Sequence, residues 1–249
     1  MGTDVRRLRW WAGPLAGALA LPVFVAVPSY GEPPGRPAVI GQRVIGHSVN
    51  DRPIRAWRLG DPEARRTVIA MATMHGDEPA PRRTLARLRD GAPISGVDLW
   101  VLPNANPDGL ARNSRYNANG IDINRNFPVN WVRAPHHGPR PASAPETRAL
   151  MRFARDIDPH FIVSFHQPLY GVDALRSKAP RFARRLAEAF RLPRKHFDCG
   201  GGCHGTMTQW FNRRFAGAQV TVEYSAHPSR RYVNRLGPRA LLRAVGGHR

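Results

Sequence analysis

The sequence predicts an α/β fold, a mixed, twisted central sheet with helices on both faces. Strand-like runs alternate with segments of helical spacing over residues 38–249, which is typical of a sheet covered by helices. Ionisable residues follow several of the apolar runs. This position matters because open α/β sheets bind ligands at the carboxyl ends of their strands. His75, His166 and Glu223 all occupy such positions.

In the first half of this domain the sequence pattern predicts a hairpin, two further strands and one helix. Strand-like runs at 39–48 and 53–59 flank a turn at Asn50-Asp51. The apolar run 67–73 predicts a buried strand that leads to His75. Prolines 79 and 81 favour the start of a helix, and a further strand follows at 98–102. Residues 103–142 are rich in Asn, Gly, Pro and Arg, and an irregular segment of that length is usually functional or disordered.

The second half adds helices and the remaining strands. Ser143, Pro145 and Glu146 predict a capped helix start, with Glu146 closing a capping box and the helix reaching about residue 157. Strands at 161–165 and 219–222 lead to His166 and Glu223. Helices are expected at 180–190, 206–215 and 238–245.

Residues 1–37 are expected to lie outside the folded domain. Arg6, Arg7 and Arg9 precede an uncharged, mostly apolar run at 10–27, which predicts a signal peptide or an N-terminal membrane anchor. The run is near the lower length limit for a membrane span, so both alternatives stay open. A Pro/Gly-rich linker follows at 31–37. The expected location is extracytoplasmic, exported or membrane-anchored in a bacterial envelope.

The formal charge of +20 is carried almost entirely by arginine, because Lys178 and Lys195 are the only lysines. One interpretation is a solvated arginine surface. The other is electrostatic attraction to an anionic cell-wall polymer or lipid. No specific nucleic-acid partner is expected, since no nucleic-acid-binding motif accompanies the charge. The sequence leaves the oligomeric state open.

Cys199 and Cys203 are the only cysteines, and glycines separate them. An exported protein permits a disulfide, and that is the favoured interpretation. Two free thiols come next. A second metal site with His204 is the least favoured, because no fourth ligand is close in sequence.

Two histidines and a glutamate form a candidate zinc site. His75 and Glu78 lie three residues apart, and His166 comes from another strand. Two imidazoles and a carboxylate leave a fourth position open, as in catalytic zinc sites. We therefore expect one Zn²⁺ per chain, which would lower the pKa of a bound water to about 7.

Other residues are candidates for catalysis. Glu223 follows an apolar strand, where an unpaired charge is costly unless it is used, and we expect it to act as general base. Arg115 and Arg125 lie within the long irregular segment. A guanidinium there can stabilise an oxyanion or hold a substrate carboxylate.

Taken together, the motifs resemble the zinc metallocarboxypeptidase family. The matching segments are His75-Gly-Asp-Glu78, Asn104-Ala-Asn-Pro-Asp-Gly109, Asp122-Ile-Asn-Arg-Asn-Phe127, Ser164-Phe-His166 and Thr221-Val-Glu223. The resemblance covers about residues 40–245. It implies that Asn124 and Arg125 bind the substrate carboxylate and that Arg115, with Arg112 close by, is the oxyanion arginine.

Within that family the short length and the segment 199–208 are most similar to murein peptide amidases. The resemblance implies a zinc exopeptidase or amidase that cuts an amide bond next to a free-carboxylate residue, with the γ-D-glutamyl–diaminopimelate bond of murein peptides as the expected target. Two features depart from the resemblance. There is no tyrosine about twenty residues before Glu223, where His204 stands instead, and the export-like N-terminus differs from cytoplasmic recycling enzymes.

Two alternatives remain. One is an N-acyl amino acid deacylase of the succinylglutamate desuccinylase and aspartoacylase type, which shares the zinc core; the intact Asn-Pro-Asp-Gly segment favours the carboxypeptidase side. The other is a non-catalytic protein that binds cell wall or a polyanion, against which the retention of the ligands and Glu223 argues.

Overall fold

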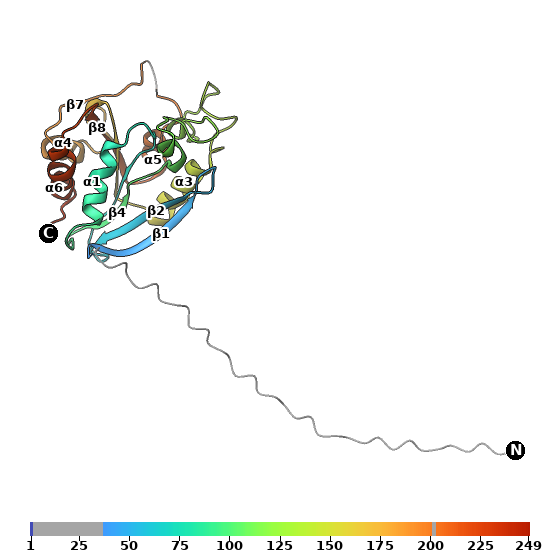
Figure 1. The fold of residues 1–249 in the computed structure, drawn as a ribbon, viewed down its shortest axis with the longest axis horizontal. Coiled ribbons are helices and arrows are strands. Elements are labelled where there is room, and N and C mark those ends of the chain that lie inside the picture. Colours follow the sequence, from blue (N-terminus) through green and yellow to red (C-terminus); the bar gives the residue numbers. More distant parts are fainter. Residues whose placement is uncertain (2–36, 201–202) are drawn as a thin grey trace. The chain divides into compact units, whose positions relative to one another are not determined.

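The structure, a computed structural model, is built on a central mixed sheet (Figure 1). It describes residue 1, residues 37–200 and residues 203–249. The expected signal peptide or anchor therefore lies outside the described residues, as does most of the linker. Among the described helices, none is both long enough and apolar enough to cross a membrane.

Eight strands of the described chain form one sheet in the order β1-β2-β4-β3-β5-β8-β6-β7. Strands β4, β3, β5 and β8 run parallel at its centre, while β2 and β6 join them antiparallel on either side. The bounds are β1 Val39–His47, β2 Pro53–Gly60, β3 Thr67–Ala72, β4 Asp98–Leu102, β5 Phe161–His166, β6 Leu169–Asp173, β7 Arg194–Lys195 and β8 Ala218–Ser225. The predicted mixed α/β sheet is confirmed.

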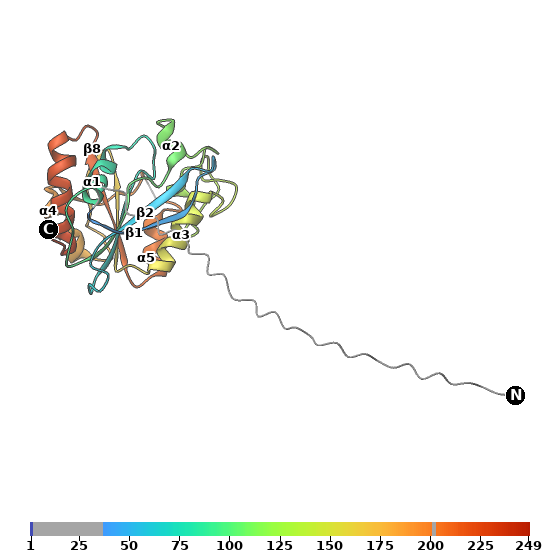
Figure 2. The same ribbon diagram turned by 60° about the horizontal axis from the view of Figure 1, so that its bottom comes forward.

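Helices cover both faces of the sheet (Figure 2). Helices α1 (Ala80–Arg89), α4 (Pro180–Phe190) and α6 (Gly237–Val245) pack over one face, where they share a core with β3, β5 and β8. Helices α3 (Pro145–Ile157) and α5 (Met207–Arg214) cover the opposite face. Because both faces are covered, the central strands are buried along almost their whole length, and β3 is almost entirely apolar, as parallel strands usually are.

Helix α4 shows how the sequence specifies this packing. Phe182, Leu186 and Phe190 recur every four residues and are buried, while the intervening arginines are exposed. Burial of each such side chain contributes about 1.5–3 kcal/mol. The helix ends at Phe190, and Arg191 after it adopts the left-handed conformation that closes many helices.

The long segment 103–142 is mostly irregular, as predicted, but contains two short helical turns. They are α2 (Pro107–Ala111) and the 3₁₀ turn η1 (Ile123–Arg125). Strands β6 and β7 and the π-helical turn η2 (Tyr232–Leu236) were not expected from the sequence. β6 escapes pattern analysis because it begins with exposed residues and contains a glycine.

The predicted capping box at Ser143 is wrong. Helix α3 begins at Pro145 with Ala144 at its N-cap and no side-chain cap. Asn126 Nδ2 instead donates to Ser143 Oγ. Glu146 is fully buried and accepts hydrogen bonds from Val49 N and Asn117 Nδ2, so it ties the hairpin to the long segment. A capping box is present at α5, between Thr206 and Gln209.

Candidate active site

The candidate residues gather at one edge of the sheet, where β3 and β5 end. His75 lies three residues after β3, and His166 is the final residue of β5. Glu223 lies inside β8, directly beside His166 in the parallel register. The sequence placed Glu223 just after a strand. The strand continues to Ser225 because its second edge pairs with β6, which the sequence did not predict.

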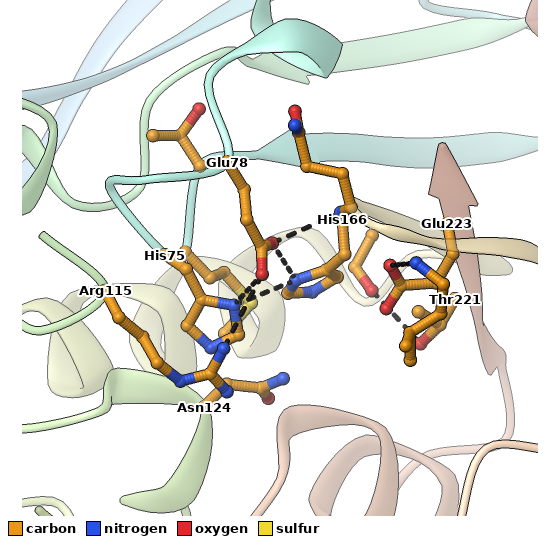
Figure 3. Close-up of polar contacts among 12 residues, drawn as sticks. His75, Glu78, Arg115, Asn124, His166, Thr221 and Glu223 are labelled. Atoms are coloured by element: carbon orange, nitrogen blue, oxygen red, sulfur yellow. Dashed lines mark hydrogen bonds and ion pairs between the residues drawn. The ribbon is translucent and has the colours of Figure 1, made fainter. Parts of the chain in front are cut away.

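His75, Glu78 and His166 bring three ligand atoms to one point (Figure 3). Glu78 Oε1 lies 2.7 Å from His75 Nδ1, Glu78 Oε2 lies 2.8 Å from His166 Nδ1, and the two Nδ1 atoms are 3.3 Å apart. All three side chains are buried. Zinc bound tetrahedrally at about 2.0–2.1 Å requires ligand atoms about 3.3 Å apart. The two Nδ1 atoms have this separation, while the Glu78 oxygens lie closer, at hydrogen-bond distance from the imidazoles. The donor set is one that zinc prefers. The residues present therefore fit a zinc ion.

The charges around this cluster favour a cation. Burial opposes protonation of His75, but the carboxylates of Asp122 and Glu78 outweigh it and raise the pKa of His75 to about 9. Burial of Glu78 is likewise outweighed by His166 and His75, which lower its pKa to about 2. The field that stabilises a proton on His75 also stabilises a divalent cation at the same point, and the two compete because a metal needs the neutral imidazole.

Asp122 orients the first ligand. Its Oδ1 lies 3.1 Å from His75 Nε2, and its Oδ2 accepts a hydrogen bond of 2.9 Å from Arg115 Nε. A carboxylate on the far nitrogen of a ligating histidine selects the tautomer whose other nitrogen faces the metal. Despite burial, the positive groups around Asp122 hold its pKa below the usual range. Sequence reasoning assigned no role to Asp122; the available signal was its place two residues before Asn124.

The Asn-Pro-Asp-Gly segment holds the loop that carries His75 and Glu78. Asn106 caps α2 by accepting from Gly109 N, and its Nδ2 donates to Met74 O at 3.2 Å. Gly76 lies directly against Gly109, where an added Cβ would come within 2.0 Å of the Gly109 carbonyl carbon. This segment therefore sets the position of the ligand loop rather than reacting with a substrate.

Arg115 and Arg112 have different surroundings. Arg115 lines the pocket beside the ligands, with Nη1 3.6 Å from Glu78 Oε1. Arg112 instead donates to Asn117 O and supports the long segment. The geometry thus brings Arg115, the sequence-predicted residue, to the site.

Asn124 and Arg125 lie on η1 and line the same pocket. Met207 N donates to Asn124 Oδ1 at 3.0 Å, which orients the amide so that Nδ2 is left to donate into the pocket. Arg125 Nη1 donates to Asn124 O. Burial is the main reason that the pKa of Arg125 is lowered, although the group stays a cation. The pair offers fixed donors for a carboxylate.

Glu223 faces the cluster from β8 (Figure 3). It is buried, and Leu169 N donates to its Oε2 at 3.3 Å. Burial, assisted by the negative charge of Glu78, raises the pKa of Glu223 despite the nearby histidines. A carboxylate with a raised pKa accepts a proton more readily near neutral pH, as a general base requires.

One pocket of about 950 Å³ is lined by the three ligands, by Glu223, and by Arg115, Asn124 and Arg125. Its volume is within the range of ligand sites. Cys199 and Cys203 are joined by a disulfide and lie on its wall. The favoured prediction of a local disulfide is therefore confirmed over free thiols and a second metal site. His204 is exposed and lies outside the lining of this pocket.

Comparison with known proteins agrees with this geometry. Residues 36–168 match the family described as zinc carboxypeptidase. Murein peptide amidase A of Escherichia coli K12 is 34% identical over 171 residues, which are 61% of this chain and 69% of that protein.

Two solved structures are similar in fold. The murein-tripeptide amidase MpaA of Escherichia coli O157 aligns with a TM-score of 0.68 and 29% identity, over 82% of this chain and 92% of that one. Carboxypeptidase A of Helicoverpa armigera aligns with a TM-score of 0.67 and 18% identity over 84% and 69%, which is a likeness of fold. With the ligand cluster, the family match and these relatives in agreement, the chain belongs to the zinc carboxypeptidase family and is a zinc-dependent hydrolase.

Proposed function

We propose that this hydrolase cuts an amide bond next to a residue with a free carboxylate, and that its substrates are murein peptides, at the γ-D-glutamyl–diaminopimelate bond. The main support is that one pocket brings together the ligand cluster, Glu223 and the Asn124–Arg125 pair. The murein assignment is supported by the similarity to murein peptide amidase A.

Substrate binding falls to the donors on η1. Asn124 Nδ2 and the Arg125 guanidinium would hold the terminal carboxylate of the residue to be released. The hydrogen bonds that Asn124 and Asp122 make to the backbone keep η1 rigid, so little ordering is needed on binding. Arg115, held by Asp122, would present its remaining N–H groups to the oxygen of the scissile carbonyl as negative charge develops there.

The proton transfers are assigned to Glu223. Held by His75, Glu78 and His166, zinc would polarise the scissile carbonyl and favour ionisation of water. Glu223 would take a proton from the attacking water and then transfer it to the nitrogen of the breaking C–N bond. The amine leaves neutral, and the other product keeps the new carboxyl group. The hydrogen bond from Leu169 N fixes one oxygen of Glu223 and leaves the other for this transfer.

A direct test compares substrates by mass spectrometry. The zinc-loaded protein should release diaminopimelate from L-alanyl-γ-D-glutamyl-diaminopimelate, and Glu223→Gln should not. Ordinary α-linked peptides with free C-termini serve as the comparison. Equal or faster cleavage of those peptides would make the protein a general carboxypeptidase and would contradict the murein assignment.

We also propose that the protein acts outside the cytoplasm, exported or membrane-anchored. Support comes from the basic and then apolar order of residues 6–27 and from the Cys199–Cys203 disulfide, since disulfides persist in oxidising compartments. Cell fractionation with alkylation of unreacted thiols checks this. Recovery in the cytoplasmic fraction with both thiols free would contradict it.

A further inference from the structure

The last part of the chain, which includes η2 and α6, carries a run of positive charge. Residues 225–249 contain six arginines and no aspartate or glutamate. Four of the arginines, at 231, 235, 239 and 243, recur every four residues and are all exposed. They extend from the start of η2 along α6.

These four arginines line one hollow of about 780 Å³ together with Arg191, which follows α4. We call this set of five arginines the arginine groove. Tyr232 also lines it and is held in place because its hydroxyl donates to Phe190 O at 2.8 Å. Helices α4 and α6 pack against each other (Figure 1).

The groove lacks compensating negative charge. Within the described part of the chain, none of its five arginines forms an ion pair with a carboxylate, although other exposed arginines such as Arg43 and Arg184 do. Like charges four residues apart on a helix are destabilising by about 0.2–0.5 kcal/mol per pair. A concave surface with this charge concentrates anions from solution.

The length of the groove indicates what kind of anion fits. Arg243 lies twelve positions after Arg231, which corresponds to at most about 18 Å along a helix with the α-helical rise of about 1.5 Å per residue. A single phosphate reaches one or two guanidinium groups, so only an extended ligand engages the whole row. Guanidinium groups match phosphate through paired N–H donors. We propose that the arginine groove binds a linear, phosphate-rich polymer.

Two other polyanionic partners fit less well. A lipid surface would be expected to contact apolar side chains beside the charges, but the exposed large apolar residues among those described lie elsewhere, for example at Ile40, Val132 and Leu175. Single-stranded nucleic acid needs aromatic rings on which bases stack. The one aromatic residue of the groove, Tyr232, is only partly exposed and is tied to Phe190.

The groove begins close to the catalytic edge. The chain leaves β8 at Ser225, and Gln167 Nε2, from the residue after the ligand His166, donates to Ala226 O at 3.1 Å. Five residues later the chain reaches Arg231. A polymer on the groove would therefore hold the enzyme with its active site near that polymer, which raises the effective concentration of any substrate attached alongside.

The test uses the full-length, zinc-loaded protein and long-chain inorganic polyphosphate as the probe. One variant carries R231Q, R235Q, R239Q and R243Q. The matched control carries R55Q, R65Q, R140Q and R213Q, which removes the same charge from exposed arginines on other elements. Affinity is measured at several salt concentrations, and peptide hydrolysis is measured to show that both variants are folded.

The groove variant should bind polyphosphate at least tenfold more weakly at about 0.15 M salt, and its log–log salt slope should fall by about 3, as expected when four phosphate contacts to a flexible strand are lost. The control should keep most of its affinity, and both should hydrolyse peptide as the parent does. An equal loss of polyphosphate affinity in the two variants would show that binding depends only on net charge and would overturn the proposal. Groove-dependent binding of anionic vesicles or of oligonucleotides that is tighter than binding of polyphosphate would also overturn the proposal.

Discussion

Glu78 and Glu223 have the same side chain and line the same pocket, yet their surroundings push their pKa values in opposite directions. Burial would raise the pKa of Glu78, but hydrogen bonds and charge from His166 and His75 lower it to about 2. Burial raises the pKa of Glu223, and the charge of Glu78 raises it further. One carboxylate therefore stays ionised as a ligand, while the other is suited to gain and lose a proton.

Glu223→Gln should separate these two roles. The amide cannot accept the proton, so the turnover number should fall by about 10²-fold or more, the scale of positioned general acid–base catalysis. Zinc content, measured by elemental analysis, should stay at one ion per chain because Glu223 is not a ligand. Loss of zinc from this variant would show that base and ligand have been confused.

Arg125→Lys should affect recognition of the terminal carboxylate. Lysine keeps the charge but not the paired planar donors, so binding of a free-carboxylate substrate should weaken by about 1.5–3 kcal/mol. The measurement is kcat/KM for a peptide and for its C-terminally amidated form. The amidated peptide should be a poor substrate for the parent and little worse for the variant. Equal cleavage of both forms by the parent would rule out the carboxylate clamp.

The sequence predicted which side chains gather at the active site but not all of their contacts. His75, Glu78 and His166 could be proposed because zinc ligands are of few types and strand ends place them together. The sequence did not assign a role to Asp122, because its function depends on which ring nitrogen of His75 it contacts. That contact is set by the three-dimensional orientation of the two side chains. The choice of Arg115 over Arg112 likewise depended on the course of an irregular loop.

The elements around the site are held by polar contacts between segments far apart in the chain. Gly76 on the ligand loop touches Gly109 of α2. Gly76→Ala should therefore displace the loop, because the added methyl group would meet backbone at 2.0 Å. We expect weaker zinc binding in a competition assay with a chelator, together with lower thermal stability. Gly41→Ala on β1, where the nearest atom would be 3.6 Å away, is the matched control. If the two variants bind zinc equally well, the loop does not depend on this contact.

A second contact joins the hairpin turn to α2. Asp108 is buried and accepts hydrogen bonds from Asn50 N and Arg52 Nη1. Burial alone would raise the pKa of Asp108, but these donors lower it. A carboxylate with a lowered folded-state pKa contributes stability above its ordinary value, and this contribution is lost as the pH falls through the folded-state pKa.

Asp108→Asn should therefore lower the free energy of unfolding by about 1.5–3 kcal/mol at neutral pH, the range for a hydrogen bond to a charged group. The difference between parent and variant should shrink as the pH falls below the ordinary carboxyl range. Urea unfolding at several pH values measures it. Asp51→Asn, which removes an exposed carboxylate from the same turn, is the control for the change in charge. A difference that does not vary with pH would contradict this account.

Elements with a strong apolar periodicity were predicted well. Elements that depend on hydrogen bonds to a neighbouring strand or a distant segment were not. Helix α4 and strand β4 have the predicted bounds because their apolar patterns are unambiguous. β6 and β7 exist because β8 and each other supply hydrogen-bonding edges. The start of α3 was misplaced because Ser143 and Glu146 bond to distant segments rather than to the helix.

For the molecule as a whole, zinc should act as a stabilising ligand. A ligand that binds only the folded state stabilises it by about 2.7 kcal/mol at a hundredfold excess over Kd, which corresponds to about 5–10 °C in Tm for a domain of this size. Chelation should lower the Tm of the parent, and restored zinc should return it. His166→Ala should show no zinc-dependent shift, whereas His227→Ala, at an exposed histidine, should behave as the parent. A full zinc response in His166→Ala would remove that residue from the ligand set.

The position of β8 in the sheet also bears on when activity can arise during synthesis. β8 is made after all the other described strands, yet it lies between β5 and β6 and carries Glu223. A nascent chain that ends before residue 218 would have the ligands of the metal cluster but no base, and β5 would have an open edge. Catalysis must therefore await synthesis of β8, so a chain whose synthesis has stopped before this strand cannot act as a hydrolase.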